Sequence, residues 1–190
     1  AASDVYKRQI APIAVAIIWR WIFNPNVGFI NQFFQAIGVD YSQQWISDPK
    51  VSLYAVFVAA LWQAIGQPMI LFLAGLQAIS PDVLEAATID GANGVKKFFF
   101  ITVPLLKDTF VIVIATLIVA AMKVYDVVQG LTGGGPNDST QMLSTYMYSQ
   151  VFQYNNVGYG TAVACIMVLL MMVVIVPVSY THLTLPTIRL

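Results

Sequence analysis

Long apolar runs separated by polar segments dominate this chain of 190 residues. A helix that crosses a bilayer needs about 20 mostly apolar residues, and three runs are long enough: residues 53–76, 109–128 and 158–176. A shorter run, residues 10–22, carries an arginine between two tryptophans, a combination typical of the membrane interface, and we interpret it as the tail of a fourth span. The pattern predicts an all-α, polytopic transmembrane bundle with three full spans plus a partial fourth.

The loops between these runs differ in basic residues, and this difference predicts their side of the membrane. The middle loop, residues 77–108, carries three lysines, whereas the loop at 23–52 carries one and the loop at 129–157 has no lysine or arginine. Loops rich in Lys and Arg stay in the cytoplasm. We therefore expect 77–108 to be cytoplasmic and the other two loops to be external.

Composition supports a membrane protein. Hydrophobic residues make up 58% of the chain and charged residues only 9%, whereas soluble domains carry about 25% charged residues. A chain this poor in charge cannot cover a water-facing surface. The formal net charge of +0 gives no indication of a nucleic-acid partner, and the single cysteine, Cys165, excludes a disulfide framework and a multi-cysteine metal site.

Both ends of the chain read as foreign to the rest. AASDVYKRQ, residues 1–9, lacks the apolar stretch of a signal peptide. Together with VSYTHLTLPT, residues 178–187, it resembles translations of one sequencing-adapter oligonucleotide in its two orientations; the alternative is a natural polar tail. We therefore expect one natural domain over 10–176, cut from a longer protein, between adapter-derived tails at 1–9 and 177–190. The only histidine, His182, falls in the second tail, which leaves no histidine for a catalytic base or a metal ligand.

Two smaller features each allow two interpretations. Pro68 interrupts the first long run, and a proline in a span frees a backbone carbonyl. The kinked helix either lines a polar pathway or is kinked without a function. NQFFQAIG, residues 31–38, is either a short amphipathic helix at the interface or a packed loop.

The segment SPDVLEAATIDGANG interrupts the apolar pattern with signals for the start and end of a helix. Ser80 fits an N-cap and Pro81 the first helical position, and Gly91 can take the left-handed conformation that ends a helix. A second short helix is expected over residues 95–102. These signals predict a helix-turn-helix along the cytoplasmic face; the alternative is an ordinary polar loop.

The same segment resembles the coupling motif of binding-protein-dependent ABC importer permeases. That motif has Glu-Ala-Ala, three residues, Gly, nine residues, Ile, one residue and Leu-Pro. This chain has Glu85-Ala86-Ala87, Gly91, Ile101 and Val103-Pro104, with Val103 in place of the usual leucine. Three further segments are similar to the carbohydrate-importer branch, the maltose-type and glycerol-phosphate-type permeases: WRWIFNPNVGFIN (19–31), FLAGLQAISPDVLEAATIDGA (72–92) and YDVVQGLTGGGPNDST (125–140).

The resemblance implies a permease domain over 10–176 in a bacterial-type cytoplasmic (inner) membrane, with further spans expected before it. The implied partners are a second permease subunit, a cytoplasmic ATPase dimer, an extracytoplasmic solute-binding protein and the small-molecule solute. ATP would be bound by the partner ATPase, because this chain has no G-x-x-x-x-G-K-[ST] motif and is not expected to be an enzyme or to hold a cofactor or metal. The residues expected to couple to the ATPase are Glu85, Ala86, Ala87, Asp90, Gly91, Ile101 and Pro104.

Lys123 and Asp126 lie near the outer end of the run at 109–128. Three residues apart, they would share a helix face, and a charge within a span usually faces the bundle interior or a pathway. With Tyr125 they are therefore candidates for the substrate path; the alternative is an ion pair at the interface. A sugar is the expected cargo. The alternatives are a cargo such as a polyamine or phosphate ester, and a secondary transporter or channel with a chance motif.

Overall fold

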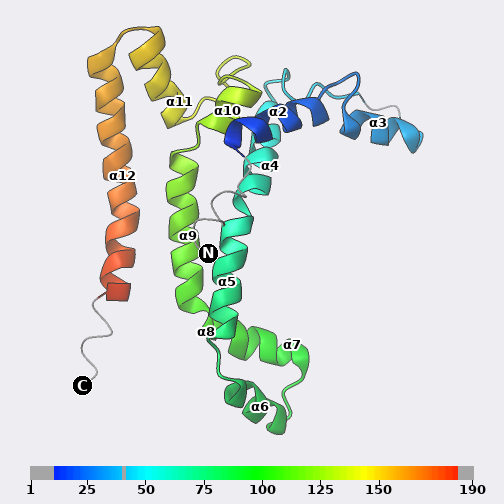
Figure 1. The fold of residues 1–190 in the computed structure, drawn as a ribbon, viewed down its shortest axis with the longest axis vertical. Coiled ribbons are helices and arrows are strands. Elements are labelled where there is room, and N and C mark those ends of the chain that lie inside the picture. Colours follow the sequence, from blue (N-terminus) through cyan, green and yellow to red (C-terminus); the bar gives the residue numbers. More distant parts are fainter. Residues whose placement is uncertain (1–10, 40–41, 184–190) are drawn as a thin grey trace. The chain divides into compact units, whose positions relative to one another are not determined.

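The computed structural model describes residues 11–39 and 42–183, with side chains as far as Tyr180, and all regular structure in these ranges is helical (Figure 1). The predicted all-α class is therefore confirmed. In chain order the α-helices and the two π-helical turns, η1 and η2, are α2 (Pro12–Ile22), α3 (Phe29–Ala36), α4 (Ser52–Ala64), α5 (Gly66–Gln77), α6 (Pro81–Ile89), α7 (Gly94–Lys97), η1 (Phe98–Thr102), α8 (Val103–Leu105), α9 (Lys107–Met122), α10 (Asp126–Leu131), α11 (Leu143–Tyr148), η2 (Ser149–Gln153) and α12 (Val157–Leu183).

The chain divides into two compact units. The first unit consists of Ala1–Gln63 and Met122–Val168, and the second of Ala64–Ala121 and Leu169–Leu190. Helices α2, α3, α10, α11 and, apart from Ala64, α4 therefore belong to the first unit, and α5 to α9 belong, apart from Met122, to the second. The long α12 begins in the first unit and continues into the second.

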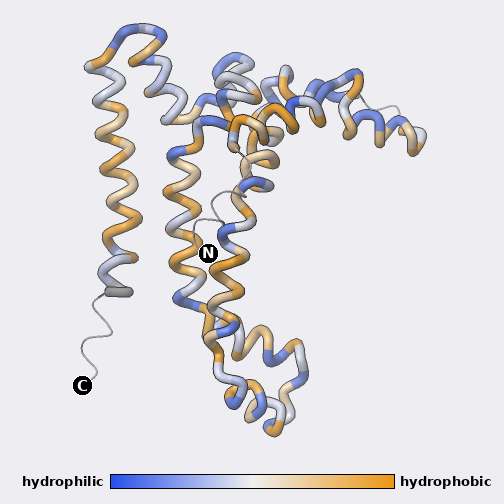
Figure 2. The backbone as a smooth tube through the Cα atoms, viewed as in Figure 1, coloured by the Kyte–Doolittle hydropathy of each residue, from blue (hydrophilic) through white to orange (hydrophobic). Residues whose placement is uncertain are grey.

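One helix is long and apolar enough to cross a membrane by itself. α12 contains a 24-residue stretch, Val157–Tyr180, with a mean hydropathy of 2.8, and Figure 2 shows apolar residues along most of its length. Two further spans are possible, each made of a bent pair of helices counted as one span. The first pair is α4 with α5, and the second is Gly94–Leu105 with α9, across a bend of 65°. α2, with 11 residues, is shorter. The described chain thus has one span, or up to three, where the sequence pattern predicts three plus a partial fourth.

The predicted interruption of the first long run is present, and it lies in the turn before Pro68, where a proline ring clashes with the carbonyl four residues earlier. α4 and α5 are separated at Ile65, three residues before the proline. Pro68 lies in the first turn of α5, where backbone N–H groups have no partner within the helix. Its missing N–H therefore removes no helical hydrogen bond, and a proline is tolerated there.

The prediction of one continuous span over residues 109–128 is wrong at its end. α9 ends at Met122, and a new helix, α10, begins at Asp126. The hydroxyl of buried Ser144 donates to the carbonyl of Val124 in the break. Three side chains of α10, those of Val127, Val128 and Leu131, enter the hydrophobic core of the first unit. These side chains are buried in that core, although hydropathy alone assigns them to the span.

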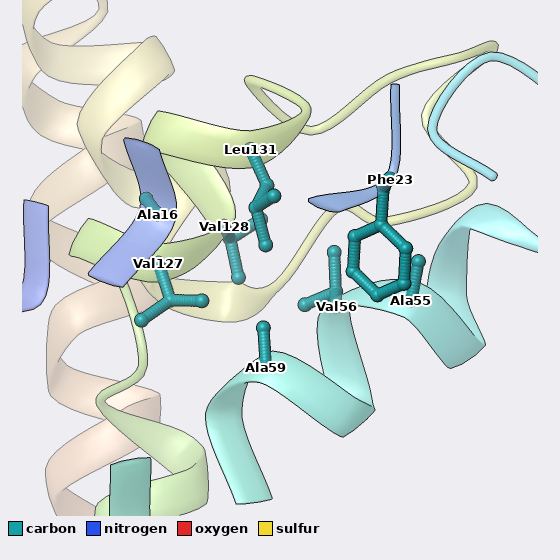
Figure 3. Close-up of a cluster of buried hydrophobic side chains, with 8 residues drawn as sticks. All are labelled: Ala16, Phe23, Ala55, Val56, Ala59, Val127, Val128 and Leu131. Atoms are coloured by element: carbon teal, nitrogen blue, oxygen red, sulfur yellow. The ribbon is translucent and has the colours of Figure 1, made fainter. Parts of the chain in front are cut away.

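That core joins three helices through mostly small side chains (Figure 3). α10 packs against α2 so closely that a Cβ at Gly130 would lie 2.5 Å from the Cβ of Ala16. Glycine is therefore required there by the approach of the two helices. The buried members of the core are Ala16, Phe23, Ala55, Val56, Ala59, Val127, Val128 and Leu131.

A buried amide orders the first predicted outer loop. Asn31 is 1% exposed; its Nδ2 donates to the carbonyls of Pro25 and Gln43, each at 3.1 Å, and its Oδ1 accepts from Trp45 Nε1 at 2.9 Å. This side chain lies on α3, which runs from Phe29 to Ala36, so the predicted helix is confirmed with shifted ends and the packed-loop alternative is wrong. Its place at the membrane interface stays a prediction.

The glycine-rich segment after α10 closes on itself through buried hydroxyl groups. Thr140 Oγ1 donates to the Gly135 carbonyl at 2.7 Å and shares a hydrogen bond with Thr132 Oγ1, also at 2.7 Å. Ser52 of α4 and Ser139 share a hydrogen bond of 2.8 Å, which attaches the segment to the core helices. Two elements that the sequence pattern does not predict, α11 and η2, follow within the loop expected at 129–157.

The start of α12 is fixed against η2. A Cβ at Gly160 would lie 2.3 Å from Val151 Cγ2, so no side chain fits at this position. Gly160, Val163 and Met167 are buried and follow one another at helical spacing, which gives the N-terminal part of α12 one buried face.

In the second unit, α5 and α9 lie side by side (Figure 1). The rings of Phe72 and Phe110 are 4.7 Å apart, and a Cβ at Gly75 would lie 2.6 Å from Thr109 Oγ1. A small residue at a helix crossing lets two backbones approach, as is usual between membrane helices.

The two segments expected to be adapter-derived have different places in the structure. Residues 1–9 lie outside the described residues. Residues 178–183 continue α12 as helix, and His182 lies beyond the described side chains. The origin of both ends stays a prediction.

Candidate functional site

The predicted helix-turn-helix is present in the second unit as α6 and α7, joined near Gly91 (Figure 1). α6 begins with Pro81 in its first turn, as predicted. Ser80 is extended, with ψ 132°, as expected for an N-cap residue, but its hydroxyl makes no capping hydrogen bond. The sequence thus predicts where the helix begins but not how its first N–H groups are satisfied.

Gly91 ends α6 in the left-handed conformation, with φ +79°. Its N–H donates to the Thr88 carbonyl at 3.1 Å, and the Ala92 N–H donates to the Ala87 carbonyl at 3.0 Å. These two bonds form a Schellman motif, which satisfies carbonyls at the helix end. A Cβ at position 91 would meet no atom within 4 Å, so the backbone conformation alone requires glycine.

The second helix is longer than the sequence predicts. Its N-cap is Asn93, whose Oδ1 accepts from the Lys96 N–H at 2.9 Å. α7 then continues through η1 and α8 to Leu105, past the expected end at residue 102. A proline ring normally clashes with the carbonyl four residues earlier. The π-turn η1 ends at Thr102, two residues before Pro104, and the helix continues past the proline to Leu105.

One side-chain contact holds the two helices together. Lys97 Nζ donates to Thr88 Oγ1 at 3.0 Å, and Thr88 Oγ1 donates to the Leu84 carbonyl at 2.8 Å. Because the lysine lies on α7 and the threonine on α6, this contact closes the turn around Gly91 from its side-chain face.

The coupling-motif residues differ in exposure. Ala87 is 7% exposed and Ile101 is half-buried, whereas the others, Glu85, Ala86, Asp90, Gly91 and Pro104, are exposed. Large apolar side chains beside them are unburied: Ile89 is 87% exposed, Val95 68% and Phe100 78%. Acidic and apolar groups of this segment are therefore open to another surface.

A pocket of about 300 Å³ in the first unit contains two of the three predicted path residues. Lys123 and Tyr125 line it together with Ser144, Met147, Tyr148 and Met167. The rings of Tyr125 and Tyr148 are 5.0 Å apart. Burial, followed by the hydrogen bond to Tyr148, raises the pKa of Tyr125, so its hydroxyl stays protonated at neutral pH.

The third predicted path residue, Asp126, is not part of this lining. The prediction that Lys123 and Asp126 share a helix face is wrong, because Lys123 lies in the break after α9 and Asp126 is the first residue of α10. Both side chains are exposed, and no ion pair joins them in the described part of the chain. Asp126 instead lies in the first turn of α10, where its negative charge interacts favourably with the helix dipole.

A second, larger hollow in the first unit is not among the sites predicted from the sequence. It has a volume of about 680 Å³ and is lined by tyrosines and amides between α11 and the start of α12, among them Tyr146, Gln150, Asn156 and Tyr159. The available signal was the run of polar and aromatic residues QVFQYNNVGYG before the last apolar run. Within residues 11–39 and 42–183, no group of three or more His, Cys, Asp or Glu side chains could hold a metal ion.

Comparison with known sequences gives a family and close relatives. Residues 8–185 match the family described as binding-protein-dependent transport system inner membrane component. A probable ABC transporter permease protein of Pyrococcus horikoshii is 36% identical over 169 residues, which cover 88% of this chain and 58% of that protein. The xylose/arabinose import permease protein XacH of Haloferax volcanii is 33% identical, covering 88% of this chain and 53% of that protein. The chain thus spans little more than half the length of these relatives.

A solved structure shares the fold. A chain in the crystal structure of a bacterial alginate ABC transporter, in complex with an alginate pentasaccharide-bound periplasmic protein, matches with a TM-score of 0.79 and 21% identity. The match covers 90% of this chain and 59% of that chain. The family match and the sequence relatives confirm the resemblance to binding-protein-dependent ABC importer permeases.

Proposed function

We propose that this chain, which belongs to the family of binding-protein-dependent transport system inner membrane components, forms part of the permease subunit of an ABC importer for a sugar or sugar-like solute. The observation that carries the proposal is the coupling segment. The residues that match the family motif form two short helices around a left-handed Gly91, and much of their surface is unburied.

In this proposal the α6–α7 segment is cytoplasmic and docks on a separate ATPase dimer. The three lysines of the loop at 77–108 support the cytoplasmic side. The Schellman motif and the Lys97–Thr88 contact support a turn stiff enough to pass on a displacement. ATP binding closes the dimer, and the segment moves with it as one body. The exposed Glu85 and Asp90 offer negative charge, and Phe100 offers apolar area, to the docking surface.

The solute path is proposed to run past the Lys123 pocket. Lys123 supplies a hydrogen-bond donor with a positive charge, and the Tyr125–Tyr148 pair supplies ring faces and hydroxyl groups. Asp126 follows the lining residue Tyr125 directly in the sequence, and its carboxylate adds negative charge near the pocket. The remaining partners are a second permease subunit and an extracytoplasmic solute-binding protein, in a cytoplasmic membrane of bacterial type.

Sugar cargo is supported by the relatives. XacH is named as a xylose/arabinose import permease, and the solved structure belongs to an alginate transporter. The uptake test described next also shows whether the cargo is instead another solute, such as a polyamine or a phosphate ester.

The test is solute uptake by the full-length permease in proteoliposomes with its ATPase, second permease subunit and binding protein. Import of a sugar is expected only with ATP inside and a loaded binding protein outside. Uptake that follows an ion gradient without ATP would overturn the importer assignment in favour of a secondary transporter. Uptake of a polyamine or a phosphate ester, with no sugar imported, would overturn the sugar cargo alone.

The path residues are tested in the same assay with Lys123→Gln, Asp126→Asn and the exposed control Lys50→Gln, which lies outside the pocket. Lower uptake is expected for the first two variants and normal uptake for the control. A cysteine placed at position 126 should react with an aqueous thiol reagent. Normal uptake by Asp126→Asn without such labelling would remove Asp126 from the path.

A further inference from the structure

The hairpin between η2 and α12 carries a hollow that the importer mechanism does not use. It is a shallow depression, open to its surroundings, with a volume of about 680 Å³. Its polar lining comes from Tyr146 of α11, Gln150 of η2, Asn155 and Asn156 of the turn, and Tyr159 of α12. None of these residues lines the Lys123 pocket, so the hollow is a separate site on the first unit.

Every polar group in the lining is neutral. No lysine, arginine or histidine is present to bind an anion, and no carboxylate is present to bind a metal ion or an amine. The hydrogen bond between the hydroxyls of Tyr146 and Tyr159 raises the pKa of Tyr146, so this phenol stays protonated at physiological pH. The lining therefore selects an uncharged ligand.

The lining combines ring surfaces with amides. The rings of Tyr146 and Tyr159 meet edge to face, 6.2 Å apart, and Asn156 Nδ2 donates to Gln150 Oε1 at 3.1 Å. The Asn155 carboxamide forms no hydrogen bond with the described part of the chain. Carboxamides both donate and accept, as sugar hydroxyls do. A pyranose or furanose also has a C–H face that packs on an aromatic ring, so a neutral sugar matches both kinds of group.

The hollow is held in shape before any ligand arrives. The Asn156 N–H donates to the Gln150 carbonyl at 2.8 Å, and the Gly160 N–H donates to the Asn156 carbonyl at 2.9 Å. Gly160 packs directly on Val151, and Asn155 takes a left-handed conformation, with φ +55°, at the tip. A preformed site loses less conformational entropy on binding than a flexible one.

We propose that this hollow is a subsite for a neutral glycosyl unit, placed on the outer end of the permease and distinct from the Lys123 pocket. The proposal rests on the proposed import of sugars and on the external placement of the loop at 129–157, which its lack of lysine and arginine supports. The subsite holds a sugar unit of the solute as it leaves the binding protein. It favours neutral sugars over charged ones.

The test is direct ligand binding to the full-length permease, assembled with its ATPase and second permease subunit in lipid nanodiscs without the binding protein. Maltotriose, cellotriose and trigalacturonate are each titrated, and binding is followed by saturation-transfer NMR. Binding of at least one neutral trisaccharide, and weaker binding of trigalacturonate, is expected. The variants are Tyr159→Ala, Tyr159→Phe and Gln150→Ala. The control is Tyr154→Ala, a tyrosine of the same hairpin that is 63% exposed and not in the lining.

Loss of a ring contact or of one hydrogen bond should raise the Kd by roughly 3- to 10-fold in Tyr159→Ala and Gln150→Ala. Tyr159→Phe should show a smaller change, and Tyr154→Ala none. Unchanged binding in both alanine variants, or no binding of either neutral trisaccharide to the unsubstituted permease, would overturn the proposal. Variants that weaken docking of the binding protein but not trisaccharide binding would also overturn it and make the hollow a protein contact. Failure of the importer itself is seen separately, as absence of ATP-dependent sugar uptake.

Discussion

The substitution Gly91→Val tests the coupling segment at the point where the structure demands glycine. Gly91 has φ +79°, a conformation that costs an L-residue about 1–2 kcal/mol and is a true outlier for a β-branched side chain. Because a Cβ at this position would meet no atom within 4 Å, steric overlap adds nothing to that cost. The whole effect therefore falls on the backbone of the turn.

A strain of this size changes the ratio of the ordered turn to other conformations by roughly 5- to 30-fold. Relief of the strain opens the two hydrogen bonds of the Schellman motif, those to the carbonyls of Thr88 and Ala87. We expect α6 and α7 to lose their fixed angle in Gly91→Val, while the hydrophobic runs that govern membrane insertion stay unchanged.

The assay is ATP hydrolysis by the assembled full-length importer with and without loaded binding protein, together with solute transported per ATP. Gly91→Val should lose stimulated hydrolysis and coupling, with membrane insertion intact. Gly91→Asn should retain most of both, because asparagine enters the left-handed region more readily than other side chains. The matched control is Gly94→Val, since Gly94 also has open space around it but lies in α7 without a positive φ. Normal stimulation and coupling in Gly91→Val would refute the reasoning.

Three further predictions follow from other parts of the molecule. Asn31→Leu removes three hydrogen bonds, to the carbonyls of Pro25 and Gln43 and from the Trp45 indole, and should lower the stability of the full-length permease by about 2 kcal/mol or more, seen as a lower Tm; an unchanged Tm would contradict the role of this amide. Gly130→Ala should destabilise by about 1–3 kcal/mol through overpacking, and Ala16→Gly in the same chain should recover part of that loss; simple additivity of the two changes would argue against their contact. The coding DNA of residues 1–9 and 178–187 should carry matched inverted adapter codons, and incompatible codons at both ends would end that interpretation.

The elements that the sequence predicts well are those decided by local chemistry. Pro81 and Gly91 mark the limits of α6 because helix ends depend on backbone groups within one turn. The sequence predicts α12 because a long apolar run crosses a membrane as a helix, which satisfies its backbone N–H and C=O groups within the segment. The helix-turn-helix of α6 and α7 is therefore predicted at the correct place in the sequence, although its second helix extends through Pro104 to Leu105.

The elements that the sequence does not predict are set by contacts with distant parts of the chain. The break before Asp126 depends on Ser144 and on the burial of α10 against α2. In the sequence Asn31 is one of several polar residues on α3, and its burial is not predicted because its hydrogen-bond partners lie 6 to 14 residues away. The hollow beside Tyr146 has the same origin, because its lining comes from three elements that only the fold brings together.

The packing of Gly160 against Val151 fixes how α12 is rotated about its own axis. Along most of its length α12 is apolar (Figure 2), so contact with lipid hardly favours one side of the helix over another. The angular setting is instead decided at one end, where Gly160 admits only the face that it shares with Val163 and Met167. One residue inserted after Gly160 would turn the rest of the helix by about 100° and shift it by about 1.5 Å. Such an insertion would leave the hydropathy of the span intact, yet every side chain beyond it would face a different neighbour.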